Sequence, residues 1–170
     1  MAAKQFEGFN LWINGNSYYG QIKGLELPEL ETETTDKMSV AGIGTQELPR
    51  LFAAMEATIT SSEYNESLSA IGADHRTTRQ FQIFSSIGEH QNGQVDSKSN
   101  IITLIGRVKA FEGGELNSED EIEMELTLAV DAYKHEYDGQ TVFDISIDPP
   151  RYVVNGQDLI AQRNNNLGIA

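Results

Sequence analysis

The sequence predicts a mainly β fold, a barrel or sandwich of about seven to eight antiparallel strands with one short α-helix. Two observations carry this prediction. Pairs of residues that tolerate positive φ recur along the chain, and several stand between β-favouring runs, as in β-hairpins; these pairs begin at Asn14, Asn92, Gly113, Asp138 and Asn155. In addition, apolar and polar residues alternate in several segments, which is typical of strands with one buried face.

The N-terminal part contains three predicted strands and the predicted helix. Segments 9–13 and 18–27 flank the first turn, and segment 51–60 alternates with an apolar face. Segment 63–71 is expected to be helical because its apolar residues recur at helical spacing; they are Tyr64, Leu68 and Ile71. Ser61 or Ser62 is expected to cap this helix, and Gly72 to end it.

A connection of about twenty residues separates the second and third strands. A length of this kind is unusual in a compact domain and indicates a functional loop or a projecting hairpin. We expect it at about residues 31–49, where an acidic stretch precedes the apolar, glycine-containing run 38–44. Apolar residues at its tip would be exposed in a lone subunit, which favours a contact with another chain.

The C-terminal half contains four further segments of strand character. Runs 81–87 and 101–111 are separated by a polar turn region at 88–100. Segment 119–131 alternates glutamates with apolar residues over ten positions, so one face should be buried and the other wet. Strand character continues to 137 and returns at 142–148, and a polar tail follows at 152–170.

The composition of the chain limits the classes of function that it can have. The chain has 170 residues, enough for a single domain spanning 1–170, and no cysteine. Its formal net charge of -14 makes specific binding of nucleic-acid phosphates improbable. The acidity has two interpretations. It keeps the protein soluble, or it forms a surface past which a polyanion moves without binding.

No constellation for catalysis or metal binding stands out. The three histidines, His75, His90 and His135, lie in separate segments without metal-ligand spacing. Glu121, Glu123 and Glu125 would be about 6.6–7 Å apart along one strand face, which could suit a carboxylate pair or a calcium cluster. A hydrated surface is the more ordinary interpretation, so we expect no enzymatic activity, no cofactor and no metal.

Taken together, the segments resemble the major tail tube proteins of contractile-tailed phages, a family related to the tubes of R-type bacteriocins. The resemblance covers most of the chain and rests on the order and spacing of motifs, which are individually weak. They are Asn10-Leu11-Trp12-Ile13-Asn14-Gly15, Tyr18-Tyr19-Gly20, Leu25 to Leu30, Met38 to Leu48, Ile105-Gly106-Arg107-Val108, the acidic alternating strand, Tyr133-Lys134, Asp138-Gly139, Val154 to Leu159 and Arg163 to Ile169.

This resemblance implies a tail-tube type β-barrel or sandwich whose copies form homohexameric rings stacked helically into a hollow tube. In the family each subunit gives a pair of hairpins to a 24-stranded inner barrel. The expected partners are the chain itself, the tail sheath protein, and tail initiator or baseplate and terminator proteins. The tube would belong to the virion, assemble in the host bacterial cytoplasm, cross the host membrane as an assembly and conduct DNA as non-specific cargo.

The resemblance also suggests residue roles. The long loop would reach the neighbouring ring through Met38, Val40, Ile43 and Leu48, and the C-terminal tail would contact other subunits through Arg163, Asn164 and Leu167. Six copies would carry 6 × -14 = -84 charges per ring. Glu121, Glu123 and Glu125 are expected to face the lumen, while the competing assignment places them outside against a basic sheath. The alternative functions are the tube of a headless bacteriocin or related contractile injection particle and, less expected, a small-ligand-binding β-barrel.

Overall fold

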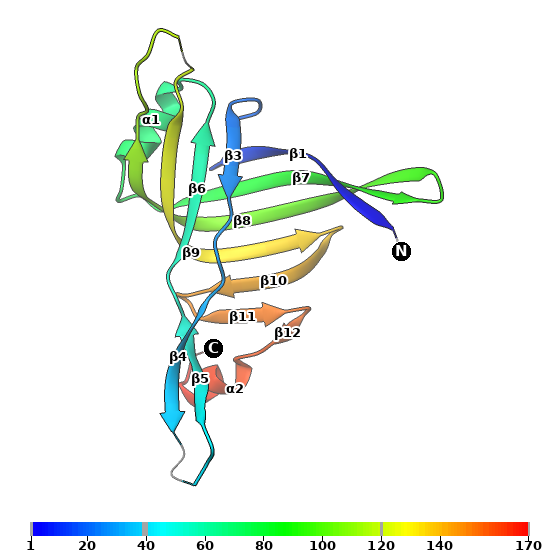
Figure 1. Cartoon of the computed structure of the whole chain (residues 1–170), viewed down its shortest axis with the longest axis vertical. Helices are drawn as coiled ribbons and strands as arrows, with labels where there is room; N and C mark the ends of the chain where they lie inside the picture. Colours follow the sequence, from blue (N-terminus) through cyan, green and yellow to red (C-terminus); the bar gives the residue numbers. More distant parts are fainter. Residues whose placement is uncertain (1, 39–40, 120, 170) are drawn as a thin grey trace.

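The computed structural model describes residues 2–38, 41–119 and 121–169. Within them it contains twelve strands and two helices (Figure 1). In chain order these are β1 (Ala3–Ile13), β2 (Asn16–Ser17), β3 (Ile22–Glu26), β4 (Thr32–Met38), β5 (Thr45–Phe52), β6 (Met55–Ser61), α1 (Glu66–Ala73), β7 (Arg79–Gln91), β8 (Gln94–Glu112), β9 (Met124–Tyr137), β10 (Gln140–Ser146), β11 (Arg151–Val154), β12 (Gln157–Asp158) and α2 (Ala161–Asn166). The predicted mainly β, antiparallel fold class is confirmed.

Strands β8 and β9 are long enough to belong to two layers. Their first layer, the large sheet, has the order β12-β11-β10-β9-β8-β7-β1-β2. The second layer, the small sheet, contains the C-terminal part of β8 and the N-terminal part of β9, which pair with each other. Residues 124–130 of β9 also pair with β6, and β6 pairs with β3. Figure 1 shows β3 and β6 crossing the large sheet at a steep angle. The result is an open sandwich and not a closed barrel.

The corner between the layers depends on two bulges, one with Asp131 as the extra residue of β9 and one with Lys109 as the extra residue of β8. The register of β8 against β9 shifts between Ile105 and Gly106 and again between Val108 and Ala110. Bulges of this kind bend a strand and increase its twist. At Gly106 the backbones approach so closely that a Cβ would lie 2.1 Å from the Ala129 carbonyl oxygen. Glycine is therefore required for this close approach.

The core lies between the two layers, and the alternation in β9 supplies much of it. Met124, Leu126, Leu128 and Val130 are buried, as the period-two pattern predicts. They pack in one cluster with residues of α1 and of four other strands, β1, β6, β7 and β8, including Leu11, Ile59, Leu68, Phe81 and Leu104. Burial of such side chains contributes roughly 1.5–3 kcal/mol each, so this cluster is the main source of stability.

The prediction of a polar turn region at residues 88–100 is wrong. Strands β7 and β8 continue through it and turn only at Asn92-Gly93, where Asn92 has a φ of 52°. The sequence lacks apolar alternation there because the outer end of this hairpin is exposed. Pairing with β1, from Ala3 to Phe6, supplies the backbone hydrogen bonds that hold the extension in place.

Several other boundaries also differ from the expectations. Helix α1 begins at Glu66, because the Asn65 side chain, and not Ser61 or Ser62, caps it by accepting from Ser67 N and Leu68 N. Gly72 lies inside this helix, against the Phe111 ring. The predicted strand 51–60 is interrupted after β5, and the tail contains a second helix, α2. Each difference reflects local hydrogen bonding or packing that residue periodicity does not report.

Candidate assembly interface

The β4–β5 hairpin is a sheet of its own that projects from the body of the protein. It pairs from Thr32 opposite Phe52 to Met38 opposite Thr45, and every residue of β4 is exposed. Figure 1 shows the hairpin extending along the long axis beyond β11, β12 and α2. This agrees with a projecting hairpin, one of the two forms that the sequence allowed.

Apolar side chains sit at the end of this hairpin without a core to cover them. Met38 is 78% exposed and Ile43 is fully exposed, whereas Leu48 is only 37% exposed. Val40 lies outside the described residues. A two-stranded hairpin is marginal in water by itself, and exposed apolar groups at its tip indicate a surface that another chain covers.

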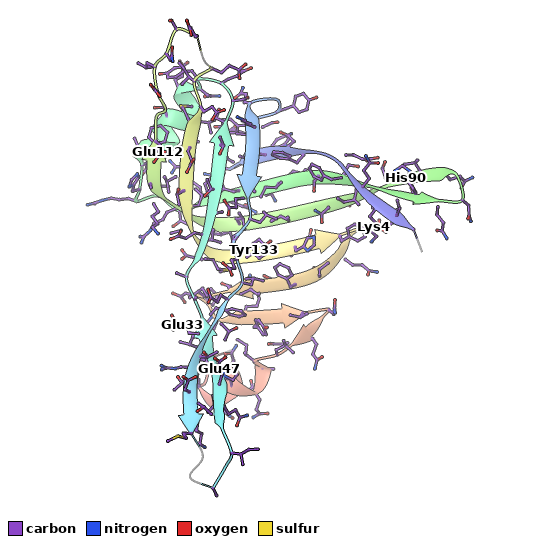
Figure 2. All side chains as sticks on the ribbon, viewed as in Figure 1. Lys4, Glu33, Glu47, His90, Glu112 and Tyr133 are labelled. Atoms are coloured by element: carbon purple, nitrogen blue, oxygen red, sulfur yellow. The ribbon has the colours of Figure 1, made fainter. Side chains whose placement is uncertain are left out.

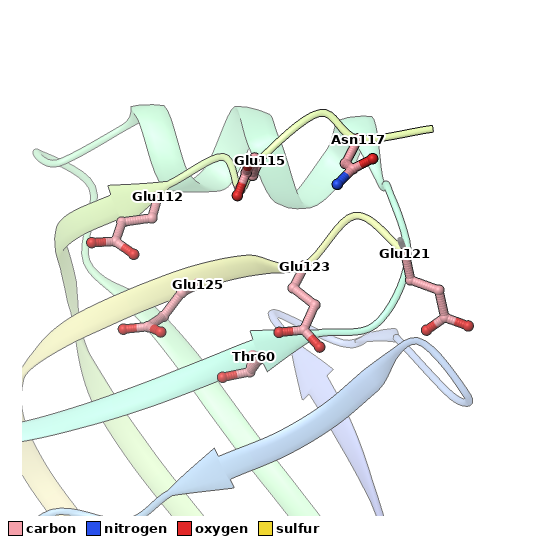
Figure 3. Close-up of a pocket in the computed structure, with 8 residues that line it drawn as sticks. Thr60, Glu112, Glu115, Asn117, Glu121, Glu123 and Glu125 are labelled. Atoms are coloured by element: carbon pink, nitrogen blue, oxygen red, sulfur yellow. The ribbon is translucent and has the colours of Figure 1, made fainter. Parts of the chain in front are cut away.

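The outward face of the small sheet is polar and acidic. Side chains alternate along β6 and β9, so that Thr58, Thr60, Glu125 and Thr127 point away from the core. At one end is a hollow of about 540 Å³, hereafter the acidic depression (Figure 3). Five glutamates line it, together with Thr60, Gly114 and Asn117; they are Glu112, Glu115, Glu121, Glu123 and Glu125.

The three glutamates singled out from the sequence therefore come together, although only Glu125 lies within a strand. Glu121 and Glu123 precede β9, where the chain still leads into the alternating pattern. Glu112 joins them because it pairs directly with Glu125 across β8 and β9. Like charges at such close positions repel. The pairing of Glu112 could have been found from the sequence only by aligning the two strands.

Few cations offset this acidity. Lys23 on β3 forms an ion pair with Glu123, and Lys109 on β8 forms one with Glu56. A second hollow on the same sheet, of about 260 Å³, is lined by four more glutamates; they are Glu26, Glu29, Glu31 and Glu56. Among the residues that the structure describes, no group of three His, Asp or Glu has a geometry that could hold a metal ion. The arrangement is an extended charged face, without the convergent geometry of a catalytic centre.

The C-terminal residues surround a second feature, an apolar groove of about 540 Å³ at the base of the projecting hairpin. Arg163 on α2 lines it beside Arg50 and Arg151. Asn164 is used within the chain, since its Nδ2 donates to the Pro150 carbonyl at 3.1 Å, and Leu167 is 56% exposed. The apolar lining comes from Pro49, Leu51, Phe52, Ile147, Pro150, Tyr152, Ile160 and Ile169. No pattern in the sequence predicts this groove, because its walls come from separate segments of the chain.

Both layers end in strands that pair on one side only. Among the described strands, β3 pairs with β6 alone, and β8 beyond Gly106 pairs with β9 alone. The small sheet thus has an unpaired edge on each side. Unpaired edges present rows of N–H and C=O groups that readily add strands from another chain.

One histidine gives the subunit a pH-dependent stability. His135 on β9 contacts Asn100 Oδ1 through Nε2 and the Phe143 ring edge-on, and burial lowers the pKa of its imidazole below the ordinary 6.5. The unfolded chain then binds this proton more readily than the folded one. The contribution is present above pH 6.5 and is lost as the pH falls from 6.5 through the lowered folded pKa.

We therefore expect the free energy of unfolding to decrease as the pH falls below 6.5, and His135→Gln to flatten that slope. Urea unfolding at several pH values measures it. His90→Gln, which removes an exposed histidine, is the matched control. An unchanged slope in His135→Gln would contradict the assignment.

A projecting hairpin with an apolar tip, unpaired edges on the small sheet and an extended acidic face are together typical of a structural subunit that assembles with other chains. The family model described as phage tail tube protein FII matches residues 3–168. The chain belongs to this family, and it is a structural tail-tube subunit of a phage-type particle and not an enzyme.

Solved structures agree on the fold at low sequence identity. A sheath/tube terminator of the PVC extracellular contractile injection system matches at 10% identity and a TM-score of 0.56, covering 75% of this chain and 92% of that one. The PVC sheath-tube complex matches at 9% identity and a TM-score of 0.54, covering 75% of this chain and 87% of that one. The tube-terminating cap of the anti-feeding prophage matches at 12% identity and a TM-score of 0.55, covering 75% of this chain and 87% of that one.

No curated protein matches the chain. Among the described residues, no helix combines the length and apolar character needed to cross a membrane.

Proposed function

We propose that copies of this chain form hexameric rings that stack helically into a hollow tube. The small sheet carries the proposal: four strand segments, from β3, β6, β9 and β8, end in two unpaired edges. Four segments from each of six copies give the 24 strands that the family resemblance implies. A closed barrel of this size removes all of these edges and leaves an open channel, since 16–18 strands already do so.

The outward face of the small sheet would then line the channel. It bears threonines, glutamates and a few lysines, whereas the outward face of the large sheet bears Trp12 and Phe84, whose rings meet edge-on at 6.2 Å. A water-filled channel suits the first composition, and a surface covered by protein suits the second. This favours the lumen for Glu121, Glu123 and Glu125, with the sheath side as the competing assignment.

An acidic channel wall repels a DNA duplex and keeps it from adhering during passage. In the proposed particle, a contractile sheath surrounds the tube, and initiator, baseplate and terminator proteins close its ends. The tube assembles in the host cytoplasm and crosses the host membrane as an assembly. The likeness to injection-system tubes supports a second candidate, the tube of a headless contractile particle that carries other cargo.

Electron microscopy of the purified protein at increasing concentration tests the proposal. Six-fold rings, or tubes built from them, are the expected result. A monomer that persists at high concentration, also in the presence of a tail initiator complex, would argue against it. The same images show whether a central channel is present.

Reversing one charge on the proposed channel wall should separate the two assignments of the acidic face. We expect particles with Glu123→Lys to assemble normally and bind their sheath, but to deliver DNA less efficiently, because the wall then attracts phosphates. DNA delivery per particle and sheath content measure the two effects.

Asp96→Lys, on the exposed β7–β8 hairpin, changes the charge by the same amount outside the acidic face and is the control. Loss of sheath with normal DNA delivery in Glu123→Lys would place the acidic face on the sheath side.

A further inference from the structure

The β8–β9 loop and the apolar groove are oppositely charged surfaces that lie toward opposite ends of the subunit. Figure 1 shows the loop between β8 and β9 at one end of the long axis and α2 and β11 toward the other end. Residues of α2 and β11 line the apolar groove. Figure 2 shows the same separation, with Glu112 near the first end and Glu47 on the hairpin beyond the second. Surfaces of opposite charge near the two ends of one molecule favour head-to-tail association.

The acidic end is a loop with an exposed apolar residue at its centre. Residues 112–125 contain seven carboxylates and no basic residue. Leu116 is 83% exposed, between Glu115 and the residues that lead to Glu119. None of the ion pairs among the described residues involves Glu115 or Glu119. Their charges are thus available to a partner.

The apolar groove has the complementary character. Three arginines and no carboxylate line the apolar groove, although the chain has only 12 basic residues against 26 acidic ones. Arg151 already pairs with Asp144 at 2.9 Å. Arg50 and Arg163 enter none of the ion pairs among the described residues. Leu51 and Ile147, which line the same groove, are 68% and 49% exposed.

We propose that the apolar groove receives the β8–β9 loop of a second copy in the adjacent ring, with Leu116 against Leu51 and Ile147, and Glu115 and Glu119 facing Arg50 and Arg163. Such a contact has the usual anatomy of an interface, an apolar centre inside a charged rim. Because the two surfaces differ, the contact repeats without closing on itself and gives every ring the same direction. This inference rests on the proposed ring-stacked tube and adds the surfaces that join the rings.

A charge exchange between two variants tests the contact. The groove variant is Arg50→Glu/Arg163→Glu, and the loop variant is Glu115→Arg/Glu119→Arg. We expect each variant alone to form rings but at least tenfold fewer stacked tubes than the unaltered protein, because like charges then meet between rings. An equimolar mixture should recover tubes, since each groove then meets a loop of opposite charge in the alternate ring.

The mixture also controls for folding, because variants that misfold cannot rescue each other. Arg76→Glu, an exposed arginine outside the groove, should leave tube formation unchanged. Tubes of normal abundance from either variant alone would overturn the proposed contact, as would folded rings that fail to stack when mixed. Absence of rings from the unaltered protein would instead overturn the proposed function itself.

Discussion

Replacing Gly106 with alanine is expected to destabilise the subunit by about 3 kcal/mol, the upper end of the usual cost of overpacking. The added methyl group would lie 2.1 Å from the Ala129 carbonyl oxygen and 3.0 Å from the Val130 Cα. Both are backbone atoms in the middle of β9, so neither can move aside without separating β8 from β9. A loss of this size is a large part of the stability of a typical domain.

Urea unfolding of the Gly106→Ala protein measures this effect. Gly44→Ala is the matched control, because a Cβ at Gly44 meets no atom within 4 Å. We expect the control to unfold at the same urea concentration as the unaltered protein. If Gly106→Ala and the control were equally stable, the backbones of β8 and β9 would not approach each other as closely at Gly106 as described above.

Shortening the β4–β5 hairpin is expected to abolish tube stacking while leaving the subunit folded. The change removes residues 37–46 and joins Asp36 to Glu47, which face each other in the hairpin, through an Asn-Gly turn. The core cluster contains no residue of β4 or β5, so the free energy of unfolding should change by only about 0.5 kcal/mol. The contact of the hairpin tip with the neighbouring ring, which the family resemblance implies, is lost together with residues 37–46.

Thermal unfolding and electron microscopy measure the two parts of this prediction. Met38→Ser/Ile43→Ser keeps the length of the hairpin and removes only exposed apolar surface, so it should weaken stacking less than the shortened hairpin does. Tubes of normal length from the shortened protein would show that the hairpin is dispensable. A large drop in melting temperature would show that the hairpin supports the fold, contrary to its lack of core contacts.

Residue periodicity predicted the fold class because burial in a sheet follows the two-residue repeat directly. The alternation of Leu126 and Leu128 with Glu125 and Thr127 identified both faces of β9. Turn chemistry was equally local: Asn14, Asn92, Asp138 and Asn155 all have positive φ, as the Asn-Gly and Asp-Gly pairs predict. The projecting hairpin was anticipated for a similar reason, since its length and apolar tip are properties of one continuous segment.

Features built from distant segments could not be predicted in this way. The apolar groove joins Leu51, Ile147 and Arg163, which lie in three parts of the chain. The length of the β7–β8 hairpin escaped periodicity because both of its faces are exposed at the outer end, so polar residues there resemble a loop. Its position depends instead on pairing with β1, which is about 80 residues away along the chain.

By itself the sequence determined a β-rich, acidic chain with a long projecting connection and a strand with one wet, glutamate-bearing face. Only the tertiary structure decided that this face also gathers Glu112 and Glu115, and that a cationic apolar groove lies at the opposite end. The physical reason is that alternation reports burial along one strand, whereas a shared surface depends on strand register and on the bulges that bend β8 and β9. Those are long-range contacts, and no single segment encodes them.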